Sequence, residues 1–528
     1  MDGANQQHEL EMLRGLLAAR DAQIAQRDEE LAHVRAEVGV RQAEIDKLRF
    51  LIRQLQRSIY GRRSEKIDPD QLQLGLEDLE QSVAAAEAAQ EAARASKLAA
   101  QRRQPARRNR GALPRHLPRE EIVIEPELKT CPCCGGELHC IGEDRSERLD
   151  IVPAQFKVVV TRRPKYGCRT CEGAVVQAPA PDHVVAGGIP SEALVAHVIV
   201  SKYADHLPLY RQAQIFARQG MQLDRATLAE WVGRAAWWLN LLHEHLFANV
   251  MSSTRLFADD TPVPVLDPGR GRTKTGRLWG YARDDRPWLG PGPPAVVYVY
   301  SEGRAHAHPI AHLAGFRGVL QVDAFPGFDR LAAQRTDVAL AHCWAHVRRK
   351  FYDVHQATNS PIAAEAIRRI AALYTVEATI RYRSADERHR VRQHSSRPIT
   401  EAFRTWLDQQ LDRVSGKSKL ADAIRYVLVR WQSLTRFLDD GRIELDTNTV
   451  EREIRPIVLT RKNALFAGSD GGARSWATMA SLIQTAKLNG VEPFGYLRDV
   501  LQRLVAGHPA SRLEELLPRH YAKQPAGG

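Results

Sequence analysis

The sequence predicts a multidomain α/β protein, and three features lead to this prediction. Apolar residues repeat every seven positions near the start of the chain, two CxxC pairs follow, and later runs of strand character contain or end in aspartates. At 528 residues the chain is long enough for several domains. Its 44% of hydrophobic and 26% of charged residues are typical of folded globular proteins.

The charge of the chain indicates the kind of partner to expect. Its formal net charge is +12, and lysine and arginine gain affinity for phosphates by releasing counterions. Nucleic acid is therefore the first expected partner. No apolar run is long enough for a membrane span, and the first residues lack the pattern of a signal peptide. We therefore expect no membrane contact and a cytoplasmic location.

Residues 1–66 carry a heptad pattern that predicts a coiled-coil leader. One heptad position is apolar throughout, at Leu10, Leu17, Ile24, Leu31, Val38, Ile45, Ile52 and Ile59. The companion position is apolar at Leu13, Val34, Leu48 and Leu55 but basic at Arg20, Arg27 and Arg41. The pattern favours a homo-oligomer joined through this segment. A single amphipathic helix folded against its own domain is the alternative.

Residues 67–120 predict an acidic helix followed by a basic linker. The stretch up to residue 100 is acidic and rich in alanine, and QRRQPARRNRGALPRHLPRE follows it. The second stretch is too polar and too rich in proline to fold alone. It could lie along DNA phosphates or serve as a solvated tether.

Residues 121–182 contain two pairs of cysteines that predict a structural zinc site. The pairs are Cys131 with Cys134 and Cys168 with Cys171, and each can supply two thiolates to a tetrahedral Zn²⁺. The run RLDIVPAQFKVVVTRRPKYG between them alternates like a strand pair, as a zinc ribbon requires. Cys133 and Cys140 are left as spare thiols, and His139 is a possible substitute ligand.

Residues 188–248 predict two helices joined by a short turn at Gly220, with Asp224 placed to cap the second helix. A helix-turn-helix of this kind could place Arg225 or Thr227 against DNA. An ordinary helical hairpin explains the pattern equally well.

Strand-like runs after residue 250 contain the candidate catalytic residues. TRLFADDTPVPVL contains Asp259 and Asp260, a turn is expected over residues 267–277, and GVLQVDAFPGF places Asp323 at the end of a later strand. Strands that present carboxylates in a mixed sheet resemble a ribonuclease-H-like core. Such carboxylates can hold Mg²⁺ or Mn²⁺ for phosphodiester chemistry, with Glu451 as the third acid.

Glu451 and its neighbour Glu453 also have simpler interpretations. Asn448 and Glu451 have the N-x-x-E spacing of a helix cap, in which the glutamate reaches back to the start of the helix. Glu453 could pair with a nearby arginine. Pro456 is expected to end or bend the helix, and a separate strand and loop would follow it.

Four long phrases of the sequence, in order and spacing, resemble the transposase of the insertion sequence 66 family. They are ADDTPVPVLDPGRGRTKTGRLWGYARDD, QVDAFPGF, AHCWAHVRRKFYDV and NTVEREIRPIVLTRKNALFAGSDGGARSWATMASLIQTAKLNGVEPFGYLRDVL. RFLIRQLQRSIYGRRSEKI and the CxxC pairs resemble the leader and the zinc-binding region of that family. The resemblance covers nearly the whole chain.

The resemblance implies a DDE triad of Asp259, Asp323 and Glu451, which would hold magnesium. The family more often reads Asp-Glu-Thr where this chain has Asp259, Asp260 and Thr261, so Asp260 is the alternative first acid. Cys343 and His346 match a C-x-x-H signature that lies near the active site in several DDE groups. The alternative for this pair is packing under the sheet.

Basic residues beside Glu451 are candidates to hold DNA phosphates. They are Arg452, Arg455, Arg461 and Lys462. The glycine-rich GSDGGAR that follows would let the backbone approach the phosphate chain.

The expected function is therefore that of a DNA transposase that cleaves the ends of its element and transfers the strands to target DNA. The alternatives are a nuclease without joining activity and a catalytically silent DNA-binding regulator. The resemblance also implies that small accessory proteins take part. The catalytic core is expected at 250–350 and 441–487, a helical insertion at 351–440 and a helical tail at 488–528.

Overall fold

The computed structural model describes residues 155–167, 175–267 and 272–521, together with Arg20 and Arg27. The chain divides into two units, Met1–Val152 and Pro153–Gly528, and the fold described below belongs to the second. The predicted coiled coil, apart from Arg20 and Arg27, lies outside the described residues, as do the basic linker and all four cysteines of the CxxC pairs. Within the described part of the chain, no helix is long and apolar enough to cross a membrane.

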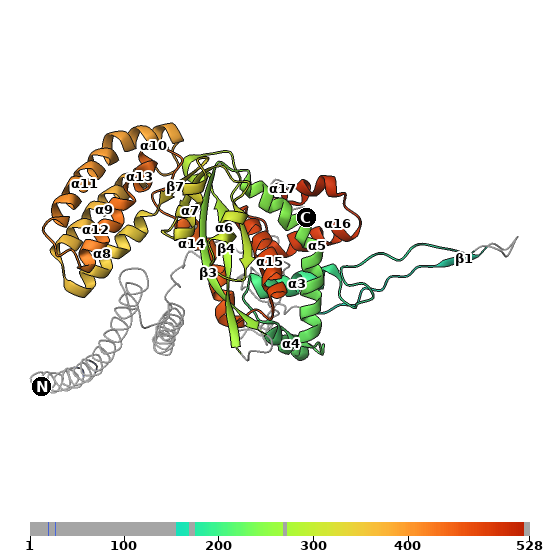
Figure 1. Cartoon of the computed structure of the whole chain (residues 1–528). Coiled ribbons are helices and arrows are strands. Elements are labelled where there is room, and N and C mark those ends of the chain that lie inside the picture. The colour runs from blue at the N-terminus through green and yellow to red at the C-terminus, as the bar shows by residue number, and fades with distance from the viewer. Residues whose placement is uncertain (1–19, 21–26, 28–154, 168–174, 268–271, 522–528) are drawn as a thin grey trace, which may run out of the picture. The chain divides into compact units, whose positions relative to one another are not determined.

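A mixed five-stranded sheet forms the centre of the second unit (Figure 1). Its strands are β3 Arg255–Asp267, β4 Arg272–Arg283, β5 Ala295–Ser301, β6 Gly318–Val322 and β7 Val338–His342. Their order is β5-β4-β3-β6-β7. Within this sheet β3, β4 and β5 are antiparallel neighbours, whereas β6 and β7 continue it in parallel with β3. β6 and β7 therefore end side by side, next to Ala258 within β3.

One group of helices packs with the sheet into a single hydrophobic core. These helices are α3 Glu192–Tyr203, α4 Leu209–Arg218, α5 Arg225–Met251, α14 Asn448–Ala464, α15 Asp470–Leu488 and α16 Pro493–Val505. Shorter elements complete this part of the chain: η1 Arg286–Trp288, α6 Ala307–His312, α7 Pro326–Gln334, η4 Ala510–Leu516 and α17 Pro518–Tyr521.

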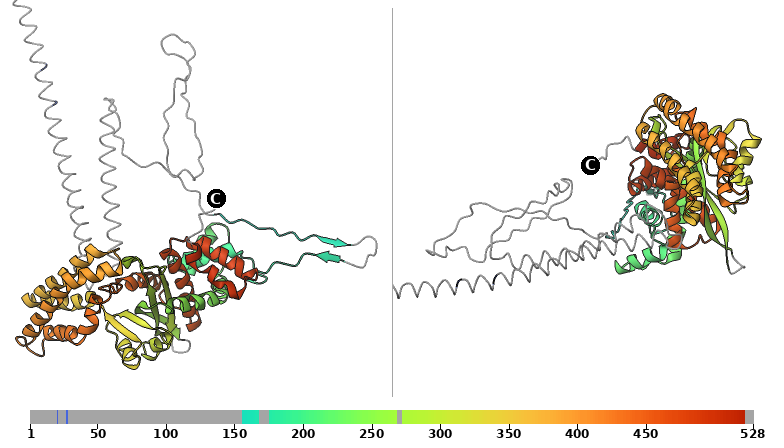
Figure 2. Two further views of the ribbon diagram at one scale, coloured as in Figure 1. Left: turned by 90° about the horizontal axis from the view of Figure 1, so that it is seen from above. Right: turned by 90° about the vertical axis from the view of Figure 1, so that its left-hand side faces the viewer.

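A second core forms among the helices between β7 and α14. They are α8 Trp344–Thr358, α9 Pro361–Ile380, α10 Ala385–Val391, the π-helix η2 Arg392–Ser396, α11 Arg397–Leu411, α12 Lys419–Val429, α13 Trp431–Thr435 and η3 Arg436–Leu438. Figures 1 and 2 show α9 to α13 on the opposite side of the sheet from α3, α5 and α16. The range predicted for a helical insertion is helical throughout, apart from short connections.

The turn expected over residues 267–277 is shorter than predicted. β4 begins at Arg272, and Asp267 pairs with Arg272 at the end of an eleven-residue register with β3. The glycines and charges of this segment suggested a long loop, but Thr273 and Thr275 alternate in a way that suits a strand. The long neighbouring strand β3 supplies the partner that makes this strand stable.

The strand pair expected before residue 168 is not formed in residues 155–164. The strands near the second CxxC pair are instead β1 Lys165–Gly167 and β2 Val175–Gln177, which pair antiparallel. Val158, Val159 and Val160 are at least 70% exposed. Alternation of apolar residues favours a strand only where a partner strand and a core are present.

Pro456 does not end its helix. α14 continues through Pro456 to Ala464, so the separate strand and loop predicted after it are wrong. Val450, Ile454 and Ile457 are buried on one face of α14, and this packing favours a continuous helix. Proline leaves the carbonyl four residues earlier without its partner, and that residue, Arg452, is exposed and lets water reach the chain there.

Candidate active site

Asp259 lies on the face of the sheet that α14 covers. Its registered partner on β4 is Gly280, and residues directly opposite each other on neighbouring strands share a face. Gly280 adjoins α14, because a Cβ at this position would lie 3.5 Å from Ile454 Cγ1. Asp259 is therefore presented toward α14, the helix that carries Glu451.

Asp260 points to the other face of the sheet, as the alternation of a strand requires. Its registered partner is Trp279, whose ring lies 6.1 Å from that of Phe328 on α7. The Asp260 carboxylate is only 1% exposed, and Arg277 and Arg304 each approach it to 2.9 Å. Two guanidinium groups therefore satisfy Asp260 on the side away from α14.

Asp323 lies beside Asp259 where β6 ends next to β3. The last registered pair of the two parallel strands is Ala258 with Val322; Asp259 is the next residue within β3, which continues to Asp267, and Asp323 directly follows the end of β6. The backbone N–H of Phe325 donates to the Asp323 carboxylate at 3.0 Å. This bond holds the carboxylate at the point where the chain leaves β6 for α7.

The electrostatics of Asp259 and Asp323 reflect burial and mutual repulsion. Burial, together with the nearby charges of Asp323, Asp260 and Glu451, raises the pKa of Asp259 to about 7. Burial also raises the pKa of Asp323, while a backbone N–H and the charge of His346 partly oppose the shift. Carboxylates that resist ionisation in this way gain from a divalent cation, because it offsets both the repulsion and the lost hydration.

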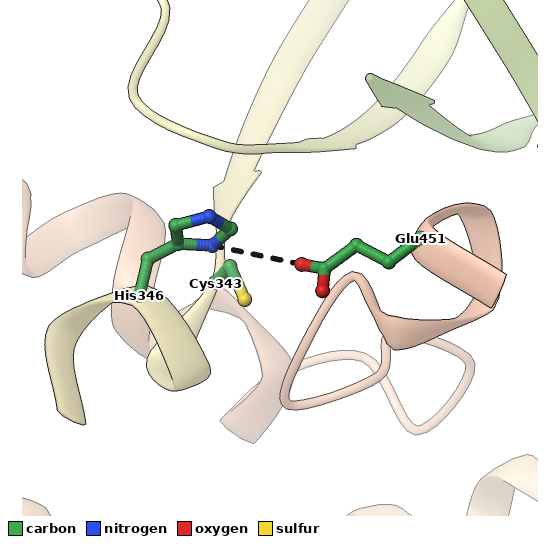
Figure 3. A group of neighbouring side chains, drawn as sticks. All are labelled: Cys343, His346 and Glu451. Atoms are coloured by element: carbon green, nitrogen blue, oxygen red, sulfur yellow. Dashed lines mark ion pairs between the residues drawn. The ribbon is translucent and has the colours of Figure 1, made fainter. Parts of the chain in front are cut away.

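Glu451 on α14 adjoins the C-x-x-H pair (Figure 3). The hydroxyl of Thr447 donates to Glu451 Oε1 at 3.1 Å, and His346 Nδ1 lies 3.9 Å from the same oxygen. Figure 3 shows the imidazole and the carboxylate directed toward each other, with the Cys343 sulfur beside them. One possible ligand atom from each of Cys343, His346 and Glu451 lies within 4.8 Å of the others.

The two residues of the C-x-x-H pair have different surroundings. Cys343 is only 2% exposed, and burial raises the pKa of its thiol to about 11. The backbone N–H of Thr447 donates to its sulfur at 3.4 Å. Packing therefore accounts for Cys343. His346 is partly exposed, and its Nδ1 has no hydrogen-bond partner in the part of the chain that the structure describes.

The structure does not form the helix cap that Asn448 and Glu451 could have made. The residue at the cap position is Thr447, and the backbone N–H of Asn448 donates to Asp446 Oδ1 at 3.1 Å. Glu451 instead accepts the Thr447 hydroxyl described above. Glu453 is half-buried, and burial raises its pKa to about 6 while Arg452 and Arg286 partly oppose the shift.

A short segment before α14 is fastened to the sheet and so places Glu451. The side chain of Gln321 on β6 donates to Glu444 O at 3.2 Å and accepts the Glu444 N–H at 3.1 Å. The backbone N–H of Trp344 donates to Leu445 O at 3.0 Å. These bonds hold Glu444 and Leu445, in the segment that leads from the helical insertion back to α14, against the ends of β6 and β7.

The basic residues predicted near Glu451 differ in their availability. Arg452 and Arg455 are exposed on α14. Arg461 is turned toward the sheet, where its Nη1 donates to Thr261 Oγ1 at 3.1 Å and also to the carbonyl oxygen of Pro262. Lys462 is partly buried. Arg452 and Arg455 are therefore the residues of this group that a large ligand can reach most easily.

The glycine-rich segment is the start of a helix rather than an open loop. Ser469 caps α15 by accepting the N–H of Gly472 at 3.1 Å. Asp470 accepts from Lys274 Nζ at 2.8 Å and from the Tyr300 hydroxyl at 2.5 Å. These bonds fasten the first turn of α15 to β4 and β5.

The two helices predicted at 188–248 are present as α4 and α5. Gly220 adopts φ +85° in the turn between them, and Phe216 and Leu228 are buried in the shared core. Asp224 occupies the cap position of α5 but accepts no capping hydrogen bond. Arg225 is exposed and Thr227 is partly exposed.

Several polar residues at the site have no separate signal in the sequence. Arg277 and Arg304 satisfy Asp260, and Thr447 positions Glu451. Strand register could have suggested Arg277, since Pro262, its partner on β3, shares a face with Asp260. Arg304 follows β5 in a connection, and no pattern in the sequence relates it to Asp260.

The fold and the site define an α/β protein with Asp259 on β3, Asp323 just after β6 and Glu451 on α14, the helix that packs against the face of Asp259, with exposed arginines on that helix. Comparison of the sequence with models of known protein families identifies the family to which the chain belongs. The model of the Transposase IS66 family matches residues 187–475, and the chain belongs to that family.

Further family models match other parts of the chain. The zinc-finger binding domain of transposase IS66 matches residues 129–172, and the IS66 C-terminal element matches residues 481–518. A model described as Transposase C of IS166 homeodomain matches residues 47–122. Membership of this family supports a transposase of an insertion sequence with DNA as its partner.

Proteins of Sinorhizobium fredii (strain NBRC 101917 / NGR234) are similar over almost the whole chain. Uncharacterized protein y4jD is 47% identical over 489 residues, which is 91% of this chain and 95% of that protein. Uncharacterized protein y4qI is 44% identical over 521 residues, which is 97% of this chain and 95% of that protein.

Proposed function

We propose that the protein is a DDE transposase that cleaves DNA at the ends of an insertion sequence and joins those ends to target DNA. Asp259, Asp323 and Glu451 are the proposed metal ligands of a ribonuclease-H-like core. The observation that carries the proposal is the placement of Asp259 on β3 beside Asp323, which follows the end of the neighbouring strand β6, with Glu451 on the helix that packs against the face of Asp259.

The residues fit Mg²⁺ or Mn²⁺ as the catalytic metal. Their donors are carboxylate oxygens, which these ions prefer, and the raised pKa of Asp259 and of Asp323 marks an excess of negative charge that a cation would offset. When bound, divalent metal supplies activation of the attacking hydroxyl and stabilisation of the leaving oxygen of a phosphodiester.

Residues of the chain around the acids have supporting roles in this proposal. Thr447 would hold the carboxylate of Glu451 in one orientation through its hydrogen bond, and His346 would lie beside the same oxygen. Arg452 and Arg455 are exposed on the same helix and would bind DNA phosphates. Asp260 would have a structural role, because Arg277 and Arg304 already satisfy its carboxylate.

The remaining parts of the chain complete the proposal. The zinc-finger segment, with Zn²⁺ held by Cys131, Cys134, Cys168 and Cys171, and the helices α4 and α5 would bind the terminal repeats. The heptad segment would join protomers so that both ends of the element are held in one complex. The protein would act on DNA in the cytoplasm at the nucleoid, together with small accessory proteins of the element.

The test is Mg²⁺-dependent cleavage and joining of labelled duplexes that carry the ends of the element. We expect the wild type to cut and join, and Glu451→Gln and Asp259→Asn to bind these ends without cutting. Asp260→Asn should retain cleavage, because its carboxylate faces the other side of the sheet. Cleavage by Asp259→Asn together with its loss in Asp260→Asn would show that the first acid has been misassigned.

The same assay separates the two alternative functions. A nuclease without joining activity would release cut ends and form no joined product. A silent DNA-binding regulator would bind the ends, and neither Mg²⁺ nor Mn²⁺ would produce cleavage.

A further inference from the structure

A pocket of about 340 Å³ opens beside Asp323, between α8 and α12. The residues that matter here are Asp323 at the end of β6, His346, Arg349 and Lys350 on α8, and Tyr426 and Arg430 at the end of α12. The α8 residues are three and four positions apart and so share one face of the helix. The pocket is therefore built jointly by the sheet edge and by the helical insertion.

The pocket concentrates positive charge next to the proposed metal ligands Asp259, Asp323 and Glu451, called the acid cluster below. Arg349 and Lys350 are exposed, and neither forms an ion pair with any residue that the structure describes. Arg430 adds a third cation. Asp323 and Asp353 contribute negative charge to the same lining, but Asp323 belongs to the proposed metal site, where a cation would offset its charge. A ligand of the pocket should therefore be an anion.

Tyr426 organises two of the cations. Its ring lies 4.5 Å from Lys350 Nζ and 4.4 Å from Arg430 Cζ, both measured to the ring centroid. The ring is thereby engaged by cations, which makes it a poor platform for stacking a base. The arrangement favours recognition of a backbone phosphate over recognition of a base.

Arg430 has unused capacity to donate a hydrogen bond. Its Nη2 lies 4.0 Å from Asp329 Oδ2, and its Nη1 donates to Tyr426 O at the long distance of 3.5 Å. Its Nε is buried and has no hydrogen-bond partner among the described residues. Buried donors in proteins are almost always satisfied, so Arg430 is held by few strong protein contacts. Its side chain is 21% exposed and lines the pocket, where it can turn toward an anion.

We propose that this pocket binds a backbone phosphate of the DNA strand close to the phosphate that is cut. Arg430, Arg349 and Lys350 provide the contacts, and Asp323 joins the pocket to the acid cluster. The inference rests on the proposed function for its placement near the cut. It gives the helical insertion a direct part in holding the substrate, through α12.

The first arm of the test measures binding to a short labelled duplex in EDTA, as a function of salt. Each phosphate contact contributes about one unit to the slope of log K against log salt. We expect Arg430→Gln to lower the slope by about one, and Arg430→Lys to lower it less. Arg425→Gln is the matched control, because Arg425 lies on the same helix outside the pocket and bonds Asp422 and Gly416.

A second variant guards against misfolding of Arg430→Gln. Arg349→Gln with Lys350→Gln changes two exposed side chains on α8, so the fold should be retained, and we expect a slope lower by one to two units. A slope equal to that of the wild type in this variant and in folded Arg430→Gln overturns the proposal.

The second arm uses element-end duplexes in which single phosphates are replaced by neutral methylphosphonates. We expect one replacement near the cut to slow cleavage by the wild type and to have little further effect on Arg430→Gln. If cleavage depends on Glu451 but no replacement distinguishes the two proteins, the pocket proposal fails while the proposed function stands. If the wild type does not cleave but the salt slopes fall as expected, phosphate binding stands and the proposed function fails.

Discussion

Asp259 and Asp260 are adjacent in the sequence but have opposite surroundings. Alternation along a strand predicts that only one of them faces the acid cluster, and it does not say which. The answer comes from register and packing: the partner of Asp259 adjoins Ile454, and the partner of Asp260 adjoins α7. Register and packing both depend on residues far along the chain. The sequence therefore identified Asp259 and Asp260 as candidates but could not show which of them faces Glu451.

The raised pKa of Asp259 predicts a pH dependence of stability in the metal-free protein. The pKa is about 7 in the fold against a usual value of 3.8. The folded state therefore holds a proton that the unfolded state has lost between about pH 4 and pH 7, and stability falls as the pH rises through this window. At pH 8 the shift of about three units corresponds to at most about 4 kcal/mol.

Thermal unfolding in EDTA checks this prediction. Asp259→Asn should raise the melting temperature at pH 8 and leave it nearly unchanged at pH 4, where the carboxyl is protonated in the folded state. Mg²⁺ should stabilise the wild type at pH 8 and have less effect on the variant. An Asp259→Asn protein that is less stable than the wild type at pH 8 without metal would contradict the pKa shift.

At the scale of elements, strands were easier to predict than their ends. The apolar runs around Asp259 and Asp323 gave β3 and β6, because burial and β-branched residues reinforce each other there. The early start of β4 and the passage of α14 through Pro456 were missed. In both cases packing against a neighbouring element outweighed a local signal from glycine or proline.

The helical insertion contains a buried ion cluster whose loss should be costly. Arg392 is fully buried, and its Nε and Nη2 donate to Glu377 at 2.8 and 2.7 Å, while Nη1 donates to Phe437 O at 2.9 Å. Arg392→Met should leave Glu377 buried with one partner fewer and lower the free energy of unfolding by about 3–5 kcal/mol. Urea unfolding measures the change.

Arg397→Gln is the control for this prediction, because Arg397 is 38% exposed and pairs with the exposed Asp439. Its loss should cost no more than about 1 kcal/mol. Similar losses in the two variants would mean that the cluster around Arg392 contributes no more than a surface pair.

Across the whole molecule, motifs predicted the family but not how distant residues meet. The spacing of cysteines, acids and the C-x-x-H pair was local enough to be read from the sequence. The pocket beside Asp323 was not, since Lys350 and Tyr426 lie on different helices and meet only because α8 and α12 pack together. No short sequence motif predicts how helices within the insertion pack together.

The zinc site predicted for residues 121–182 can be tested on the intact protein. Elemental analysis of the full-length protein should find one Zn²⁺ per chain, and Cys131→Ser or Cys168→Ser should lower that content. Cys343→Ser is the matched control, since Cys343 is buried and packing accounts for it. Loss of zinc in Cys343→Ser alone would place the metal at Cys343, His346 and Glu451 instead.

The attachment of Glu444 and Leu445 to the sheet has a consequence for protein synthesis. A ribosome completes the strands with Asp259 and Asp323 long before it reaches Glu451, and the whole helical insertion is made in between. The return segment can dock on Gln321 and Trp344 only after that insertion has emerged. A nascent or prematurely terminated chain therefore lacks the third acid, and unfinished copies cannot assemble the acid cluster.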